Sequence, residues 1–172
     1  MKVIIINGPS CSGKSTIAKE ICRQSNDKFV HLQIDEFKRF LFTIINHDSV
    51  EHSRGQKICN RMLVTNAKAF LDNGFNVVID TTFYGEKAKD IAKIHLEQLS
   101  DYKLMFIGID CSLEERLRRF KAYNDNPVRN EKTIISQSNV FEFCKEFYDA
   151  EFDTEKLNAE QIAKIILNNH NI

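Results

Sequence analysis

The sequence predicts an α/β fold with three α/β/α layers, in which helices cover both faces of a mainly parallel five-stranded sheet. Short apolar runs alternate along the chain with longer stretches of helical periodicity. Several of these runs stop at a polar residue, and a glycine-rich loop separates the first run from the first helical stretch. The strands are expected at residues 3–6, 29–34, 75–79, 103–109 and 151–153.

Local signals justify the helices between these strands. Ile58, Met62, Thr65 and Ala69 recur at helical spacing, and Asn73-Gly74 then ends this long helix as a C-cap does. The other helices follow the glycine loop, the second strand, the third strand, the fourth strand and two later polar breaks. The helices are expected at residues 16–24, 37–45, 49–72, 86–99, 112–119, 132–148 and 159–169.

Two helix starts carry capping residues. Ser112 is followed three residues later by Glu115, which is the spacing of a capping box. Asn158 stands directly before the last helical stretch, where its side chain is placed to accept a hydrogen bond from a free main-chain N–H.

Length and composition favour one domain over residues 1–172, because a chain of 172 residues is long enough to bury a core. Lys plus Arg equals Asp plus Glu at 24 each, so no overall basic field attracts nucleic acid or a membrane surface, although a local basic groove is still open. The apolar run after Lys2 is too short for a signal peptide or a membrane span. The five cysteines form no Cys-x-x-Cys pair. We therefore expect reduced thiols in a cytoplasmic protein without a membrane partner.

Residues 8–15 carry the pattern Gly-x-x-x-x-Gly-Lys-Ser between a predicted strand and a predicted helix. The glycines permit backbone angles that let consecutive N–H groups curl around an anion, and the helix N-terminus adds its dipole. Lys14 adds a positive charge for the outer phosphates, and Ser15 a hydroxyl for Mg²⁺. ATP is expected because the guanine-reading sequence Asn-Lys-x-Asp does not occur. The residues expected at the phosphates are Gly8, Pro9, Ser10, Cys11, Ser12, Gly13, Lys14, Ser15 and Thr16.

Carboxylates follow three of the predicted strands, as Asp35, Asp80 and Asp110, and ligands bind beyond the carboxyl ends of strands in such sheets. Asp80 is placed to hold Mg²⁺ near Ser15, with a turn cap as the alternative. Asp35 and Arg39 lie four residues apart at the start of a helix, so both can face an acceptor. Asp35 is the candidate general base for an attacking hydroxyl, and a helix N-cap is the alternative.

Residues 81–85 are expected to border the acceptor. Thr82, Phe83 and Tyr84 are the candidate contacts, and the two aromatic rings are suited either to stacking on the acceptor or to the core. A lid is expected around residues 116–131, where Arg116, Arg119 and other arginines suit the charge on a transferring phosphoryl group. A solvated helix face is the alternative for these arginines.

Three functions fit these residues. The first is a kinase that moves the γ-phosphate of ATP to the hydroxyl of a small-molecule acceptor. In the second, the acceptor is a nucleoside, a nucleotide or the 5′ end of a polynucleotide, although the neutral net charge argues against long nucleic acid. The third is a non-catalytic ATP-binding regulatory protein.

The chain resembles the family of small P-loop kinases that contains chloramphenicol phosphotransferase. The similar segments are residues 5–15, 34–37, 78–85, 107–119 and 148–154. The resemblance implies the P-loop kinase fold and phosphoryl transfer from ATP. It implies that Asp35 is the base, that Lys14 and Arg119 act on the phosphates, and that Asp153 and Thr154 lie beside the nucleotide base. Tyr123 stands where a lid arginine is usual, and residues 40–75 do not match, so chloramphenicol specificity is not implied.

Overall fold

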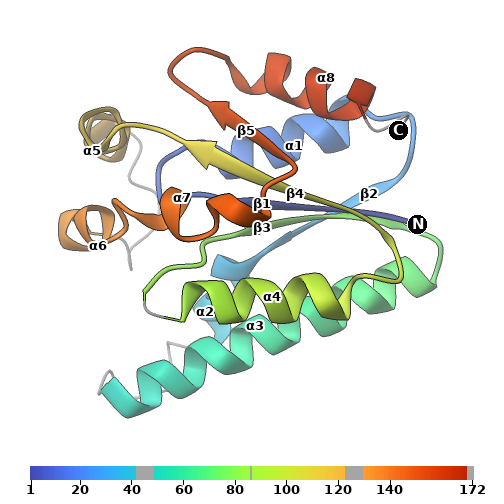
Figure 1. Cartoon of the computed structure of the whole chain (residues 1–172), viewed down its shortest axis with the longest axis horizontal. Helices are drawn as coiled ribbons and strands as arrows, with labels where there is room; N and C mark the ends of the chain where they lie inside the picture. Colours follow the sequence, from blue (N-terminus) through green and yellow to red (C-terminus); the bar gives the residue numbers. More distant parts are fainter. Residues whose placement is uncertain (42–48, 86, 123–129, 170–172) are drawn as a thin grey trace.

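The computed structural model describes residues 1–41, 49–85, 87–122 and 130–169. Its centre is an all-parallel five-stranded sheet with the strand order β2-β3-β1-β4-β5 (Figure 1). The strands are β1 (Lys2–Asn7), β2 (Phe29–Gln33), β3 (Asn76–Thr81), β4 (Lys103–Asp110) and β5 (Ala150–Asp153). The predicted α/β class with a mainly parallel five-stranded sheet is confirmed.

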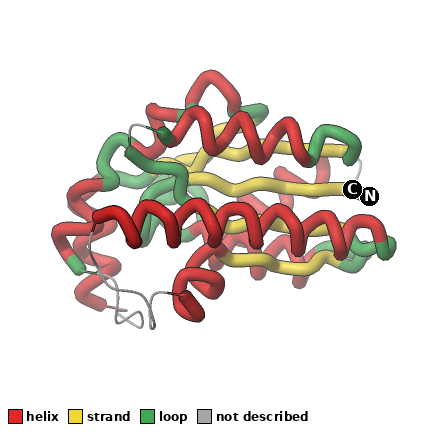
Figure 2. The backbone as a smooth tube through the Cα atoms, turned by 90° about the horizontal axis from the view of Figure 1, so that it is seen from below, coloured by secondary structure: helices red, strands yellow, loops and turns green. Residues whose placement is uncertain are grey.

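Helices cover both faces of this sheet. Helices α3 and α4 lie on one face, and α1 and α8 lie together on the other (Figures 1 and 2). The helices are α1 (Lys14–Gln24), α2 (Ile34–Leu41), α3 (Ser49–Asp72), α4 (Ala88–Gln98), α5 (Leu113–Ala122), α6 (Glu131–Ser136), α7 (Val140–Phe143), the 3₁₀ turn η1 (Lys145–Phe147) and α8 (Ala159–Asn169). None of these described helices is long and apolar enough to cross a membrane.

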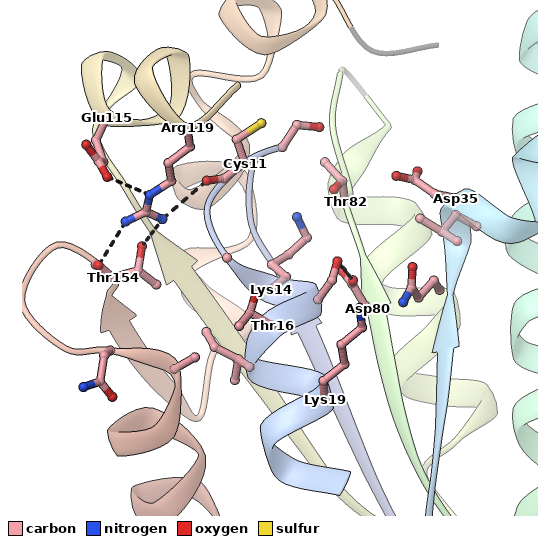
Figure 3. A pocket seen from close by; sticks show the side chains of 18 of the residues that line it. Cys11, Lys14, Thr16, Lys19, Asp35, Asp80, Thr82, Glu115, Arg119 and Thr154 are labelled. Carbon is pink, nitrogen blue, oxygen red and sulfur yellow. Dashed lines mark hydrogen bonds and ion pairs between the residues drawn. The ribbon is translucent and has the colours of Figure 1, made fainter. Parts of the chain in front are cut away.

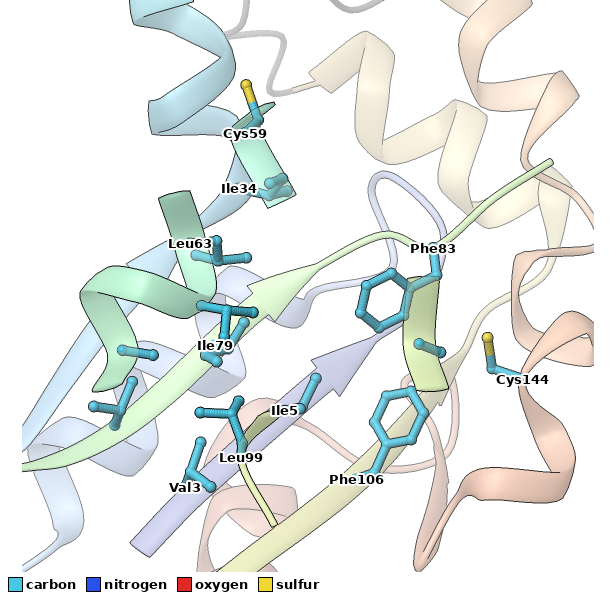
Figure 4. Close-up of a cluster of buried hydrophobic side chains, with 14 of the residues drawn as sticks. Val3, Ile5, Ile34, Cys59, Leu63, Ile79, Phe83, Leu99, Phe106 and Cys144 are labelled. Carbon is cyan, nitrogen blue, oxygen red and sulfur yellow. The ribbon is translucent and has the colours of Figure 1, made fainter. Parts of the chain in front are cut away.

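The apolar run of β1 feeds both layers of the core. Val3 and Ile5 pack in the cluster under α3 and α4, which Figure 4 shows, while Ile4 and Ile6 pack under α1 and α8. All four side chains are at most 1% exposed. Each such burial stabilises the fold by about 1.5–3 kcal/mol, so a central strand covered on both faces is apolar throughout rather than alternating.

The predicted ends of three helices are confirmed by their hydrogen bonds. Gly74 ends α3 with φ 85°, and the N–H of Phe75 bonds to Phe70 O at 3.0 Å, as in a Schellman motif. Ser112 Oγ accepts from the N–H of Glu115 at 3.3 Å before α5. The cap of α8 is reciprocal, because Asn158 and Gln161 each accept the other's N–H, at 2.9 and 3.0 Å.

The prediction of one continuous helix over residues 132–148 is wrong. The chain forms α6, α7 and η1 with turns between them. Polar residues interrupt the helix, since the hydroxyls of Ser136 and Ser138 bond to main-chain carbonyls three residues earlier. The side chain of Gln137 also turns away to the phosphate loop. These competing bonds replace a continuous ladder of main-chain hydrogen bonds.

Part of the expected lid lies outside the described residues. Residues 123–129, which include Tyr123, fall there, as do residues 42–48 at the end of the predicted second helix. The described part of the lid region consists of the second half of α5 and the start of α6.

Candidate active site

A cavity of about 620 Å³ opens at the carboxyl ends of the strands (Figure 3). This volume is within the usual range for small-molecule sites. The wall is built by the glycine loop, the start of α2, the end of β3, α5 and the segment between β5 and α8. The predicted site residues that line it are Ser10, Cys11, Gly13, Lys14, Ser15, Thr16, Asp35, Arg39, Asp80, Thr82, Arg119 and Thr154.

The glycine loop is held in a tight conformation before α1. Gly13 has φ 97°, and a Cβ on Gly8 would lie 2.5 Å from the main-chain O of Ile109, so both positions require glycine. Lys14 begins α1, is buried, and donates from Nζ to Pro9 O at 3.0 Å. The loop therefore wraps around its own lysine at the wall of the cavity.

Asp80 and Ser15 meet at the end of β3. Ser15 Oγ donates to Asp80 Oδ2 at 2.5 Å. Burial raises the pKa of the Asp80 carboxyl, but His31, Lys14 and Ser15 together bring this pKa below its ordinary value. An ionised carboxylate beside a hydroxyl is a hard oxygen donor set of the kind that Mg²⁺ prefers, so these residues fit the expected metal.

His31 lies beside Asp80 and was not predicted as a site residue. Its Nε2 lies 3.8 Å from Asp80 Oδ2, and Gln33 Nε2 lies 3.3 Å from its Nδ1. The available signal was a polar residue at every second position of an otherwise apolar strand. This strand, β2, pairs in parallel with β3 just before Asp80, so its polar side chains lie near that carboxylate.

Asp35 lies across the cavity from the glycine loop. It stands in the first turn of α2, its side chain is 40% exposed, and Lys38 Nζ approaches its Oδ1 to 3.5 Å. Figure 3 shows its carboxylate directed toward the side of the cavity where Thr82 lies. Thr82 Oγ1 donates to Gly8 O at 3.1 Å, and Arg39 pairs with Glu36 at 3.2 Å.

Arg119 ties α5 to two other parts of the site (Figure 3). Its guanidinium donates to Glu115 at 2.8 Å, to Thr154 Oγ1 at 3.0 Å, to Thr154 O at 3.1 Å and to Cys11 O at 3.4 Å. Thr154 in turn donates to Ser12 O at 2.9 Å. Asp153 does not line the cavity, and its carboxylate pairs instead with Lys156 at 2.9 Å.

Of the two alternatives for Phe83 the core is correct, and the prediction for Arg116 is wrong. Phe83 is 2% exposed and packs edge-on against His95 and Phe106. Its ring is therefore part of the core and does not contact the acceptor. Arg116 is 1% exposed and donates from Nη1 to Ile134 O at 3.0 Å, so it packs α5 on α6 instead of lining the cavity. In both cases packing against another element, α4 and β4 for Phe83 and α6 for Arg116, decides the direction of the side chain.

Tyr84 lies next to the cavity without lining it. Its hydroxyl accepts from Gln56 Nε2 at 3.4 Å. Burial raises the pKa of the Tyr84 hydroxyl, and the negative charge of Asp35 raises it further, which places this ring within electrostatic reach of Asp35.

The family model of chloramphenicol phosphotransferase-like proteins matches residues 1–171. The chain belongs to this family. The glycine loop, Asp35 and the cavity at the carboxyl ends of the strands all lie within the matched residues. No curated protein matches the sequence of this chloramphenicol phosphotransferase-like protein.

Solved structures share its fold at low sequence identity. A sugar kinase from Janibacter has a TM-score of 0.69 at 17% identity, covering 98% of this chain and 93% of that chain. The APS kinase of Mycobacterium tuberculosis, in complex with AMPPNP and APS, has a TM-score of 0.69 at 15% identity, covering 97% and 95%. A chain of the Pnkp1/Rnl/Hen1 RNA repair complex has a TM-score of 0.66 at 22% identity, covering 86% of this chain and 46% of that chain.

Family and fold together support a P-loop kinase. The kinase neighbours, one of them in complex with AMPPNP, agree with the expected binding of ATP. The expectation against a nucleic-acid partner is not supported, because one neighbour belongs to an RNA repair complex.

Proposed function

We propose that this protein is an ATP-dependent kinase that transfers the γ-phosphoryl group to a hydroxyl of a small-molecule acceptor. The observation that carries the proposal is that Asp35 and the glycine loop, with Lys14, line the same cavity from different elements. A phosphate-binding loop and a carboxylate across one cavity are the parts that phosphoryl transfer to a hydroxyl requires.

The charge of the cavity supports a polyphosphate ligand. Among the described residues, basic side chains outnumber carboxylates along the wall, although the whole chain is neutral. The N–H groups of the loop and the N-terminus of α1 add to this local field. A triphosphate is therefore attracted to the loop side of the cavity.

Ser15 and Asp80 are the residues that would hold Mg²⁺. When bound, the ion supplies charge neutralisation on the outer phosphates. Because the factors around Asp80 bring its pKa below the ordinary value, the carboxylate is ready to act as a ligand at neutral pH.

In the proposed reaction, Asp35 accepts the proton of the acceptor hydroxyl while the hydroxyl oxygen bonds to the γ-phosphorus of ATP. The bond from that phosphorus to the bridging oxygen breaks, and the electron pair leaves with ADP. Lys14 offsets charge on the phosphoryl oxygens, and Arg119 anchors α5 at the loop and at Thr154. Arg39 is placed to contact the acceptor beside Asp35.

An acceptor screen tests the reaction class. ATP labelled in the γ-phosphate is incubated with chloramphenicol and other hydroxylated antibiotics, sugars, nucleosides and a 5′-hydroxyl oligonucleotide. Label on an antibiotic or a sugar supports the proposal, and label on a nucleoside or on the oligonucleotide favours the nucleoside and polynucleotide alternative. ATP binding without transfer to any of these favours the regulatory alternative.

Asp35→Asn tests the assignment of the base. We expect turnover with the acceptor to fall by about 100-fold or more, while AMPPNP affinity changes little, because the carboxylate acts on the acceptor and not on the nucleotide. Asp90→Asn is the matched control, since Asp90 is also in the first turn of a helix but is exposed outside the cavity. Turnover of Asp35→Asn equal to that of Asp90→Asn would refute the role of Asp35.

A further inference from the structure

The main-chain amide of Ser10 is held by a side chain from a distant part of the chain. Ser10 N donates to Oε1 of Gln137 at 2.7 Å, although the two residues are 127 positions apart. Gln137 is 4% exposed and forms the C-cap of α6. A buried amide oxygen that accepts a loop N–H makes a directional contact, in contrast to general apolar packing.

The segment that carries Gln137 is itself anchored to α5. Arg116 donates to the carbonyl of Ile134, which lies one helical turn before Gln137 in α6. From the same helix α5, Arg119 reaches Cys11 O directly. Helix α5 is therefore connected to the phosphate loop by two routes, one through Arg119 and one through α6 and Gln137.

The peptide unit between Pro9 and Ser10 connects Gln137 to Lys14. A peptide unit is planar, so holding its N–H also sets the direction of its carbonyl. That carbonyl, Pro9 O, accepts from Lys14 Nζ at 3.0 Å and from Ser12 N at 3.3 Å. The orientation of one peptide plane thus depends on Gln137 on one edge and on Lys14 and Ser12 on the other.

We propose that Gln137 is a positioning residue for nucleotide binding, which fixes the Pro9–Ser10 peptide and through it the loop and the Lys14 ammonium. Its effect on affinity rests on the proposed ATP-binding function, whereas its effect on the conformation of the loop does not. Proton chemistry and direct contact with phosphate are not part of this role. Gln137 acts through Ser10 and Lys14.

Gln137→Met is the sharpest variant, because methionine is similar in length and volume but offers no amide oxygen. The Ser10 N–H then loses its hydrogen-bond partner. Loss of such a hydrogen bond typically changes the equilibrium constant that it influences by about tenfold. Gln98→Met is the matched control, since Gln98 is an exposed glutamine at the end of α4. Gln137→Glu keeps an oxygen at the same reach and serves as the rescue variant.

Two readouts on the full chain separate positioning from general stability. The first is amide exchange of Ser10 in the nucleotide-free protein, measured by NMR, which we expect to rise about tenfold in Gln137→Met and to stay at the wild-type rate in Gln98→Met and Gln137→Glu. The second is affinity for AMPPNP and for AMP, which lacks the outer phosphates. We expect Gln137→Met to weaken AMPPNP about tenfold and AMP less than about twofold.

Each result decides between the possibilities. Unchanged Ser10 exchange in Gln137→Met, loss of Ser10 protection in Gln137→Glu, or equal weakening of AMPPNP and AMP overturns the proposal. If wild-type protein binds no AMPPNP while Ser10 exchange still depends on Gln137, the ATP-binding function fails and the positioning of the loop stands. If AMPPNP binds equally to wild type and Gln137→Met, the function stands and the positioning role is wrong.

Discussion

Ser15 and Asp80 are 65 residues apart in sequence, yet the Ser15 hydroxyl lies 2.5 Å from the Asp80 carboxylate. The contact follows from the sheet, because β1 pairs in parallel with β3 and Ile6 lies opposite Asp80 in that register. The carboxyl ends of the two strands therefore meet where the phosphate loop begins. This meeting places an ionised carboxylate beside the first turn of α1.

Asp80→Asn is expected to remove Mg²⁺-dependent nucleotide binding. An amide carries no charge to offset the ion, so we expect AMPPNP affinity in the presence of Mg²⁺ to fall on the order of 100-fold and affinity without Mg²⁺ to change little. Calorimetric titration with and without the ion measures both. Asp110→Asn, at the exposed end of β4, is the control, and a similar loss in both variants would contradict the metal role of Asp80.

Gly8→Ala is expected to disturb the loop through overlap. The added Cβ would lie 2.5 Å from Ile109 O, so we expect the free energy of unfolding to fall by roughly 1–3 kcal/mol and AMPPNP binding to weaken. A Cβ added to Gly74 would meet no atom within 4 Å, but φ is 85°, so Gly74→Ala should cost roughly 1–2 kcal/mol through backbone strain alone. Urea unfolding and AMPPNP titration compare the two variants, and equal AMPPNP affinities would contradict this account of Gly8.

His95 is expected to make stability depend on pH. Burial lowers the pKa of this histidine from 6.5 to about 4, and the unfolded chain therefore binds more protons than the folded chain between these values. Its contribution to stability is fully present above about pH 6.5 and is lost as the pH falls toward 4. The loss amounts to about 3 kcal/mol over this window.

Urea unfolding at pH 7 and pH 4.5 measures this effect against His95→Met, which removes the titrating ring but keeps an apolar side chain near Phe83. We expect the variant to lose much less stability than wild type between the two pH values. Parallel losses in the two proteins would show that other groups cause the acid sensitivity.

Features set by a few neighbouring residues were predicted correctly. The end of α3 at Gly74 depends on one left-handed residue, and the caps at Ser112 and Asn158 depend on side chains that reach only three positions along the chain. The apolar strands were also recognised, because burial on both faces of a parallel sheet leaves continuous apolar runs.

Features set by packing between separate elements were predicted wrongly, left open or missed. An arginine near a phosphate loop is a good candidate for a phosphate ligand, but Arg116 packs α5 on α6. Phe83 was suited to either the acceptor or the core, and the position of His95 and Phe106 decided for the core. Gln137 carried no local signal at all, since its partner Ser10 is 127 positions away in the sequence.

The sequence by itself determined the α/β class, the phosphate loop and the carboxylates at the strand ends, because these depend on local periodicity and on the backbone freedom of Gly8 and Gly13. Only the tertiary structure decided which of these groups share one cavity. The strand order β2-β3-β1-β4-β5 puts β3 beside β1 and brings Asp80 to Ser15. A contact between segments far apart in sequence depends on the packing of whole elements, so it cannot be predicted from any short stretch of residues.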